Sequence, residues 1–306
     1  MQPTERIPTN HARSGYAAPT RTYDFLMNYR HGYHAGNFAD VFKHAVLLEL
    51  LRVMLAKPTP ISYFETHAGA GRYALDAEQA LITKEYEGGI AKLFGVTGLP
   101  PELARLVEQV KAVNFPGTLR WYPGSPALAS AMLRPDDRLQ LCELEPSEAR
   151  ALKHAYAHDA RTQVHAGDGY QTLKALLPPT PRRGLVLIDP PYESHDEFQQ
   201  VSEALKAALA RWATGVYLIW YPIKDGRQLA PFKRLLKNLP VKSLLTAELC
   251  VHPDQSALRL NGSGVAIINA PYRFEMALER ILTPLHRLLR EAPRARAQWQ
   301  WLKAPS

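Results

Sequence analysis

The segment with the clearest capacity for chemistry is Asp189-Pro190-Pro191-Tyr192, which directly follows the apolar run 185–188. A short, continuous apolar run predicts a buried parallel strand, and two prolines then end its ladder and stiffen the loop. Ligands of open α/β sheets bind at the carboxyl ends of such strands. Asp189 and a proline carbonyl can accept the two N–H groups of a planar exocyclic amine, and Tyr192 can stack on a base. The segment therefore predicts a site that holds a nucleobase amine.

A second candidate segment is the glycine-rich turn 68–71, which follows the predicted strand 61–65. Glycines let a ligand approach the backbone closely, and a helix amino terminus behind them favours polar or anionic groups. The dinucleotide fingerprint G-x-G-x-x-G is incomplete, because Ala74 stands at the third glycine position. By itself the turn therefore fits a structural role as well as a binding role.

Two acidic residues end the next predicted strands. Glu143 closes a strand that begins near residue 138, and its carboxylate can hold the two ribose hydroxyls of an adenosine. Asp168 follows the predicted strand 162–165 and can accept the adenine amine. Taken singly, each acid fits an ordinary surface loop. Taken as a series at successive strand ends, they predict a crevice for an adenosyl cofactor.

The sequence does not indicate a metal site. Zinc requires well-spaced Cys and His ligands, and no spacing here matches. Because His67 lies within the glycine turn, contact with a cofactor is the better interpretation for that residue. Cys142 and Cys250 fall in apolar, strand-like segments and are interpreted as buried thiols. The histidines near the glycine turn are His31, His34, His44 and His67.

Alternation of strands and helices through the middle of the chain predicts a doubly wound α/β sheet. Strands are expected at 216–221, 244–251 and 264–269, and the last two follow each other without a helix. This arrangement predicts an antiparallel hairpin at the sheet edge. Residues 73–117 are mainly helical and form a small helical insertion. Helices are expected at 40–55, 149–156, 197–212, 229–239 and 274–289, with a final strand near 298–302.

The chain has 306 residues and a formal net charge of +8. We expect one large domain at 27–306, preceded by a polar N-terminal extension, 1–26, that is disordered. No apolar run approaches the length of a membrane span and no signal segment is evident, so a cytoplasmic protein without a membrane partner is expected. The positive charge favours a polyanionic partner, although each basic cluster also fits a solvated helix face.

Several motifs are jointly similar to one enzyme family. The similarity extends from about residue 27 to the C-terminus and includes Trp220-Tyr221-Pro222. Together the motifs resemble the bacterial large-subunit ribosomal RNA adenine-N6 methyltransferase J family, which modifies one adenine of 23S rRNA. The main motifs are Tyr29-Arg30-His31, His34-Ala35-Gly36-Asn37, Asp40-Val41-Phe42-Lys43-His44, Thr66 to Tyr73, Tyr122 to Pro126, and Ile188 to Glu193.

This resemblance implies a Rossmann-like, class I S-adenosylmethionine-dependent methyltransferase, a monomer that binds 23S rRNA and needs no metal. Asp189 would be the catalytic carboxylate and would also touch the cofactor, and Tyr29 would meet the substrate RNA. Pro190 and Tyr192 would hold the target base. By motif match, the cofactor S-adenosyl-L-methionine would be bound by Lys43, His44, His67, Ser125, Glu143, Asp168, Gly169 and Asp189.

Other functions stay open from the residues alone. A D-P-P-Y motif is shared with enzymes that methylate guanine N2 in rRNA or adenine N6 in DNA. A non-catalytic RNA-binding protein could retain the same fold, although Glu143, Asp168 and Asp189 are all present. A nicotinamide dehydrogenase is disfavoured by the incomplete glycine fingerprint.

Overall fold

The structure is a computed structural model that describes residues 30–194, 196–224, 226–253 and 260–305. The expected extension 1–26 and the proposed RNA contact Tyr29 lie outside these residues. No helix within the described part of the chain combines the length and apolar character needed to cross a membrane.

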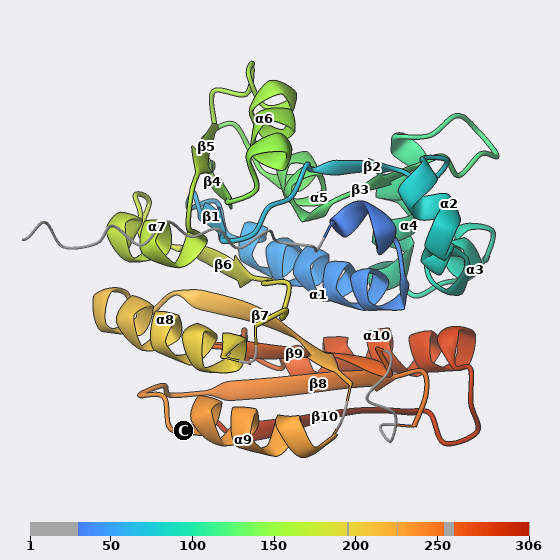
Figure 1. The fold of residues 1–306 in the computed structure, drawn as a ribbon. Helices are drawn as coiled ribbons and strands as arrows, with labels where there is room; N and C mark the ends of the chain where they lie inside the picture. Colours follow the sequence, from blue (N-terminus) through green and yellow to red (C-terminus); the bar gives the residue numbers. More distant parts are fainter. Residues whose placement is uncertain (1–29, 195, 225, 254–259, 306) are drawn as a thin grey trace, which may run out of the picture.

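The described residues form an eight-stranded sheet with the strand order β10-β8-β9-β7-β6-β1-β4-β5 (Figure 1). Neighbours from β5 to β7 pair in parallel, so their carboxyl ends meet at one edge of the sheet. The strands are β1 (Ser62–Glu65), β4 (Arg138–Glu143), β5 (Thr162–Ala166), β6 (Gly184–Ile188), β7 (Val216–Ile223), β8 (Leu244–Cys250), β9 (Gly262–Ile268) and β10 (Arg296–Lys303).

The antiparallel hairpin of β8 and β9 is present, but it does not form the sheet edge. β9 inserts between β7 and β8 and pairs antiparallel with both. β10 then pairs with the far side of β8 and becomes the outer strand. The reason is burial: every residue of β8 and β9 is buried, so both strands need neighbours and covered faces.

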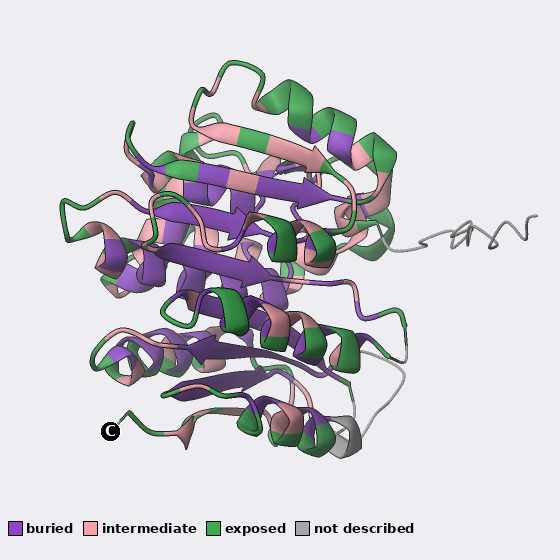
Figure 2. Ribbon diagram, turned by 90° about the vertical axis from the view of Figure 1, so that its left-hand side faces the viewer, coloured by how far each residue is buried: buried purple, intermediate pink, exposed green. Residues whose placement is uncertain are grey.

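Helices cover both faces of the sheet, and the strands are apolar on both sides as a result (Figure 2). Along β6, Leu185 and Leu187 face one core cluster, and Val186 and Ile188 face the other. This two-sided burial is the physical basis of a doubly wound α/β fold. The helices are α1 (Phe38–Leu55), α5 (Ser125–Met132), α6 (Pro146–Ala155), α7 (Gly169–Leu176), α8 (Glu197–Arg211), α9 (Gly226–Lys237) and α10 (Phe274–Leu289).

Helix α1 carries several site residues and is buried along almost its whole length. It begins at Phe38, two residues before the expected start, because the Asn37 side chain accepts a hydrogen bond from the Asp40 backbone N–H at 2.9 Å. Two charged residues of this helix, Asp40 and Lys43, each expose only 3% of their surface to solvent. Buried charges of this kind require partners, and these come from the site described below.

The insertion after β1 is helical, as expected, but a two-stranded antiparallel ribbon frames it. Its strands, three residues each, are too short to show an alternating pattern in the sequence. The helix α4 packs against α1 and α10, so the insertion covers the α1 side of the domain (Figure 1). Its elements are β2 (Arg72–Ala74), α2 (Glu78–Thr83), α3 (Ala91–Phe94), α4 (Pro101–Ala112) and β3 (Trp121–Pro123).

Candidate active site

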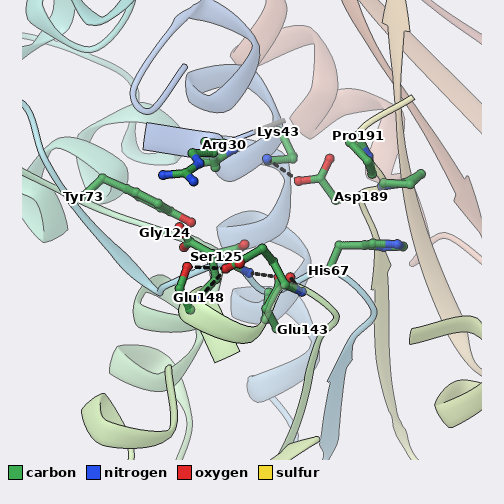
Figure 3. Close-up of a pocket in the computed structure, with 16 residues that line it drawn as sticks. Arg30, Lys43, His67, Tyr73, Gly124, Ser125, Glu143, Glu148, Asp189 and Pro191 are labelled. Atoms are coloured by element: carbon green, nitrogen blue, oxygen red, sulfur yellow. Dashed lines mark hydrogen bonds and ion pairs between the residues drawn. The ribbon is translucent and has the colours of Figure 1, made fainter. Parts of the chain in front are cut away.

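A pocket of about 780 Å³, including the solvent at its mouth, lies at the carboxyl ends of β1, β4 and β6. The strand order reverses between β1 and β6, and ligands bind at such switch points in open α/β sheets. Figure 3 shows Lys43 and Asp189 on one side of this pocket and Glu143 and Glu148 on the other. The sequence-predicted residues that line it are Lys43, His67, Ser125, Glu143, Asp189 and Pro190.

Asp189 is held by a lysine from the first helix. Lys43 Nζ lies 2.5 Å from Asp189 Oδ2 and 2.9 Å from Asp40 Oδ1. Burial by itself lowers the pKa of Lys43, but the two carboxylates outweigh it and the pKa is raised, so the ammonium stays charged. The other oxygen of Asp189, Oδ1, has no hydrogen-bond partner among the described residues and can accept one from a ligand.

The glycine turn is fixed by the carboxylate of Glu143. Glu143 Oε2 accepts the Gly69 backbone N–H at 2.7 Å, and Oε1 accepts the Glu145 N–H at 2.8 Å. Gly69 has φ +60, and a Cβ there would lie 2.0 Å from the Tyr73 hydroxyl, so only glycine fits. The lip of the pocket is therefore formed by bare backbone beside a carboxylate.

A further carboxyl group, Glu65 at the end of β1, lies behind the lining residue Ser125 and does not itself line the pocket. Glu65 is fully buried, and it accepts hydrogen bonds from the hydroxyls of Ser125 and, at 2.8 Å, Tyr63. Burial raises the pKa of Glu65 to about 8. Ser125 begins α5, so its hydrogen bond to Glu65 joins the end of β1 to the helix that follows the insertion.

His67 lines the pocket, and two other predicted cofactor contacts lie behind it. Burial lowers the pKa of His67 to about 4, so its imidazole is neutral near pH 7. Asp168 is exposed and caps α7 by accepting the Tyr170 and Gln171 backbone N–H groups. Asp168 and Gly169 do not line the pocket, although the adjacent Tyr170 ring packs edge-on against His67 at 5.1 Å.

His44 is also outside the pocket lining. It is fully buried beside Tyr122, whose hydroxyl lies 2.8 Å from His44 Nδ1. Burial lowers the pKa of His44 to about 3 and keeps the ring neutral. The described geometry gives His44 a place in the packing behind Lys43, and it does not bring the ring to the ligand space.

The ring of Tyr192 was expected to stack on a base, but in the structure it is buried and does not line the pocket. Tyr192 has φ +52 and is 8% exposed, and its ring packs against Phe198 and Trp220. Its hydroxyl donates to the Trp220 carbonyl at 2.7 Å. The positive φ turns the side chain into the core, so Tyr192 anchors the loop that carries Asp189 and Pro190.

Several lining residues were not predicted as cofactor contacts. Arg30 and His31 approach from the segment before α1, and His31 Nε2 lies 3.0 Å from Asp40 Oδ2. Tyr73 comes from the unexpected strand β2 and packs against the His31 ring at 4.8 Å. The aromatic and basic residues of 28–37 were the feature of the sequence that could have indicated that this segment lines the pocket. The remaining unpredicted lining includes Glu145, Ser147 and Glu148.

The residues present fit an adenosyl cofactor with a sulfonium centre. The carboxylate of Glu143 suits a ribose diol, and the bare backbone at Gly69 admits a ligand closely. The pocket lining holds more acidic than basic side chains, which favours a cationic group nearby. The acids are Glu143, Glu145, Glu148 and Asp189, and the Lys and Arg side chains are Arg30 and Lys43. Within the described residues, no cluster of three or more His, Cys, Asp or Glu is arranged to hold a metal ion.

A mostly parallel, doubly wound sheet with this pocket at its switch point is a Rossmann-like fold, and the similarity to known proteins shows that the chain is a methyltransferase of this fold. A family model described as "Ribosomal RNA large subunit methyltransferase D, RlmJ" matches residues 58–303. The chain belongs to this family, whose members include proteins named "Ribosomal RNA large subunit methyltransferase J".

Two such relatives and one solved structure illustrate the similarity. The Escherichia coli protein is 41% identical over 277 residues, covering 90% of this chain and 99% of the relative. The Haemophilus influenzae protein is 40% identical over 283 residues, with the same coverage. The crystal structure of a Legionella pneumophila protein has a TM-score of 0.80 at 35% identity, and covers 88% of this chain and 97% of that one.

Proposed function

We propose that this protein transfers a methyl group from S-adenosyl-L-methionine to N6 of an adenine in 23S ribosomal RNA, in the cytoplasm. The observation that carries the proposal is that Asp189, which directly follows β6, lines the same pocket as Glu143 and Gly69, with no partner among the described residues on its Oδ1. The relatives from Escherichia coli and Haemophilus influenzae, named for methylation of large-subunit rRNA, support the choice of substrate.

Adenine N6 is a poor nucleophile, because its lone pair is delocalised into the ring. In this proposal Asp189 Oδ1 and the Pro190 carbonyl accept its two N–H groups, which orients the amine and favours its pyramidal form. When bound, the cofactor supplies an electrophilic methyl group on a sulfonium. Positioning and electrostatics then account for most of the rate enhancement.

Lys43 contacts one carboxylate oxygen of Asp189, Oδ2, and leaves the other, Oδ1, for the amine. A carboxylate is too weak a base to remove a proton from a neutral aryl amine. The proton therefore leaves N6 after the methyl group has arrived, when the nitrogen is acidic, and Asp189 is the nearest acceptor. Because a duplex hides N6, the target adenine must leave its stack to enter the pocket.

On the cofactor side, we assign the ribose hydroxyls to Glu143 and the neighbouring walls to His67 and Ser125. Asp168 and Gly169, which hold the start of α7 beside His67, support this wall from behind. Tyr29, outside the described residues, remains the proposed contact to RNA. The protein is proposed to act as a monomer.

The experiment is methyl transfer with labelled cofactor onto unmodified 23S rRNA transcribed in vitro, followed by nuclease digestion and mass spectrometry. We expect label in N6-methyladenosine at one site. Label in N2-methylguanosine, or transfer to duplex DNA but not to rRNA, would overturn the assignment. Asp189→Ala should abolish transfer while calorimetry still detects cofactor binding; near-normal turnover in that variant contradicts the role of Asp189.

A further inference from the structure

The ribbon of β2 and β3 has two chemically different faces. Tyr73 pairs with Tyr122, and both rings are buried on the inner face. Side chains alternate along strands, so Arg72 and Trp121 share the outer face, as diagonal neighbours across the pair. Tyr73 lines the pocket, and the outer face therefore begins one residue from the pocket wall.

On the outer face, two guanidinium groups lie against one aromatic ring. The Arg72 guanidinium carbon is 4.1 Å from the Trp121 ring centroid, and that of Arg120 is 5.6 Å away. Arg120, 61% exposed at its side chain, also pairs with Asp76 at 2.7 Å. Among the described residues no carboxylate pairs with Arg72, so its charge is available to an anionic ligand.

The adjoining turn presents a third group in a fixed position. The Asn114 side chain accepts the backbone N–H groups of Arg120 and Trp121, both at 2.8 Å, and donates to the Trp121 carbonyl. Phe115 follows directly and is 83% exposed, on a turn closed by the Thr118 N–H to its carbonyl at 3.0 Å. A large apolar ring held out in water gains nothing for folding, and the neighbouring Asn114 is joined to the Trp121 backbone.

Arginine paired with exposed aromatic rings is the composition of single-stranded nucleic acid surfaces, where guanidinium groups contact phosphates and rings stack on bases. The ribbon surface (Arg72, Phe115, Arg120 and Trp121) combines both groups within reach of the pocket. Protein interfaces are also enriched in Arg and aromatic residues, so the choice of occupant rests on the adjoining pocket, which is proposed to take an adenine of rRNA. RNA is the occupant that matches both the charge and the separate rings.

We propose that the ribbon surface binds the unpaired strand that flanks the target adenine, with Arg72 and Arg120 on phosphates and Trp121 and Phe115 against bases. The inference rests on the proposed function, because it deepens how that substrate is held. A flipped adenine needs its flanking strand held near the pocket. Strand β2 carries both Arg72 and the lining residue Tyr73, and Figure 1 shows β2 and β3 beside the helices of the insertion.

The test uses the full chain and the unmodified 23S rRNA transcript, and compares Phe115→Ala and Arg120→Ala with the unmutated protein. Each variant should raise the Kd and KM for RNA roughly five- to twentyfold. Their kcat and their affinity for S-adenosylmethionine should not change. Arg120→Ala should also reduce the salt slope of log Kd by about one, whereas Phe115→Ala should leave the slope unchanged.

A matched control lies near the amino ends of the parallel strands, opposite to the carboxyl ends that form the pocket. Tyr272 is 87% exposed with the Arg273 guanidinium 5.2 Å from its ring centroid, which is the same chemistry. The nearby Asn269 donates to the Gly215 carbonyl, at the start of β7 and away from the pocket. Tyr272→Ala and Arg273→Ala should leave Kd and KM unchanged.

The outcomes separate the two proposals. If the unmutated protein fails to methylate adenine in the transcript, the proposed function is wrong whatever the variants do. If it methylates normally and both ribbon variants bind RNA within twofold of it, the ribbon surface is not an RNA contact. Equal losses in the Tyr272 and Arg273 controls would overturn it as well, by showing that any exposed Arg–aromatic pair contributes.

Discussion

Lys43 Nζ lies 2.5 Å from Asp189 Oδ2, although the two residues are 146 positions apart in the chain. The contact joins the first helix to the loop after β6, and it settles which oxygen of Asp189 remains for a substrate. It also couples folding to the site, because both Lys43 and its second partner, Asp40, are buried.

Lys43→Met should lower both activity and stability. It leaves the buried Asp40 and the partly buried Asp189 without the ammonium that they share, which should cost about 3–5 kcal/mol in the free energy of unfolding. The methyl-transfer rate should fall at least ~100-fold, because Asp189 loses its fixed orientation. Urea titration and single-turnover assays measure the two effects.

The control is Arg52→Met on the same helix, whose half-exposed guanidinium pairs with Glu49. It should cost about 1 kcal/mol or less, because Arg105 still pairs with Glu49. Equal losses in both variants would show that Lys43 has no special role in the site.

Glu143→Gln should weaken cofactor binding. The carboxylate accepts two backbone N–H groups, and an amide can accept at only one of its two positions. We expect about a tenfold higher Kd for S-adenosylmethionine by calorimetry, corresponding to about 1.4 kcal/mol. Glu203→Gln, on the exposed face of α8, should bind normally. An unchanged Kd in Glu143→Gln would rule out its role in holding the ribose.

Glu65 should make stability fall as pH rises. Burial raises the pKa of Glu65 in the folded state to about 8, from an ordinary value of 4.5. Between these values the unfolded chain has lost a proton that the folded chain keeps, so raising the pH favours unfolding. The side chain of Glu65→Gln cannot ionise, so the variant should not lose stability in this way. The free energy of unfolding of Glu65→Gln, relative to that of the unmutated protein, should therefore be higher at about pH 8 than at about pH 5. Urea titrations at both pH values measure this, and parallel pH profiles would contradict it.

Gly169→Ala should be destabilising even though Gly169 does not line the pocket. A Cβ at this position would lie 2.0 Å from the Thr66 carbonyl oxygen, so the start of α7 would have to move. We expect a loss of about 1–3 kcal/mol and a weaker His67 wall. Gly167→Ala, with no atom within 4 Å of its Cβ, is the matched control and should be close to neutral. Thermal unfolding of the two variants decides the point.

Most strands of the sheet, and the acidic residues at their carboxyl ends, could be predicted from the sequence. The apolar run 185–188 and the acids at 143 and 189 mark strand ends, because parallel strands buried on both faces leave a simple pattern. The β2–β3 ribbon could not be predicted, because strands of three residues are too short to show an alternation of apolar and polar side chains. The position of β9 inside the sheet could not be predicted either, because the spacing of the hairpin does not show which of its two strands pairs with β7.

Within the site, the sequence alone determined which chemical groups are present and that Glu143 and Asp189 end strands of one sheet, because local pattern depends on near neighbours. Only the tertiary structure decided that Lys43 contacts Asp189 and that Tyr192 turns into the core. It also decided that Asp168 caps a helix. The reason is that long-range pairing and backbone φ depend on packing between distant segments, which residue type and spacing do not encode.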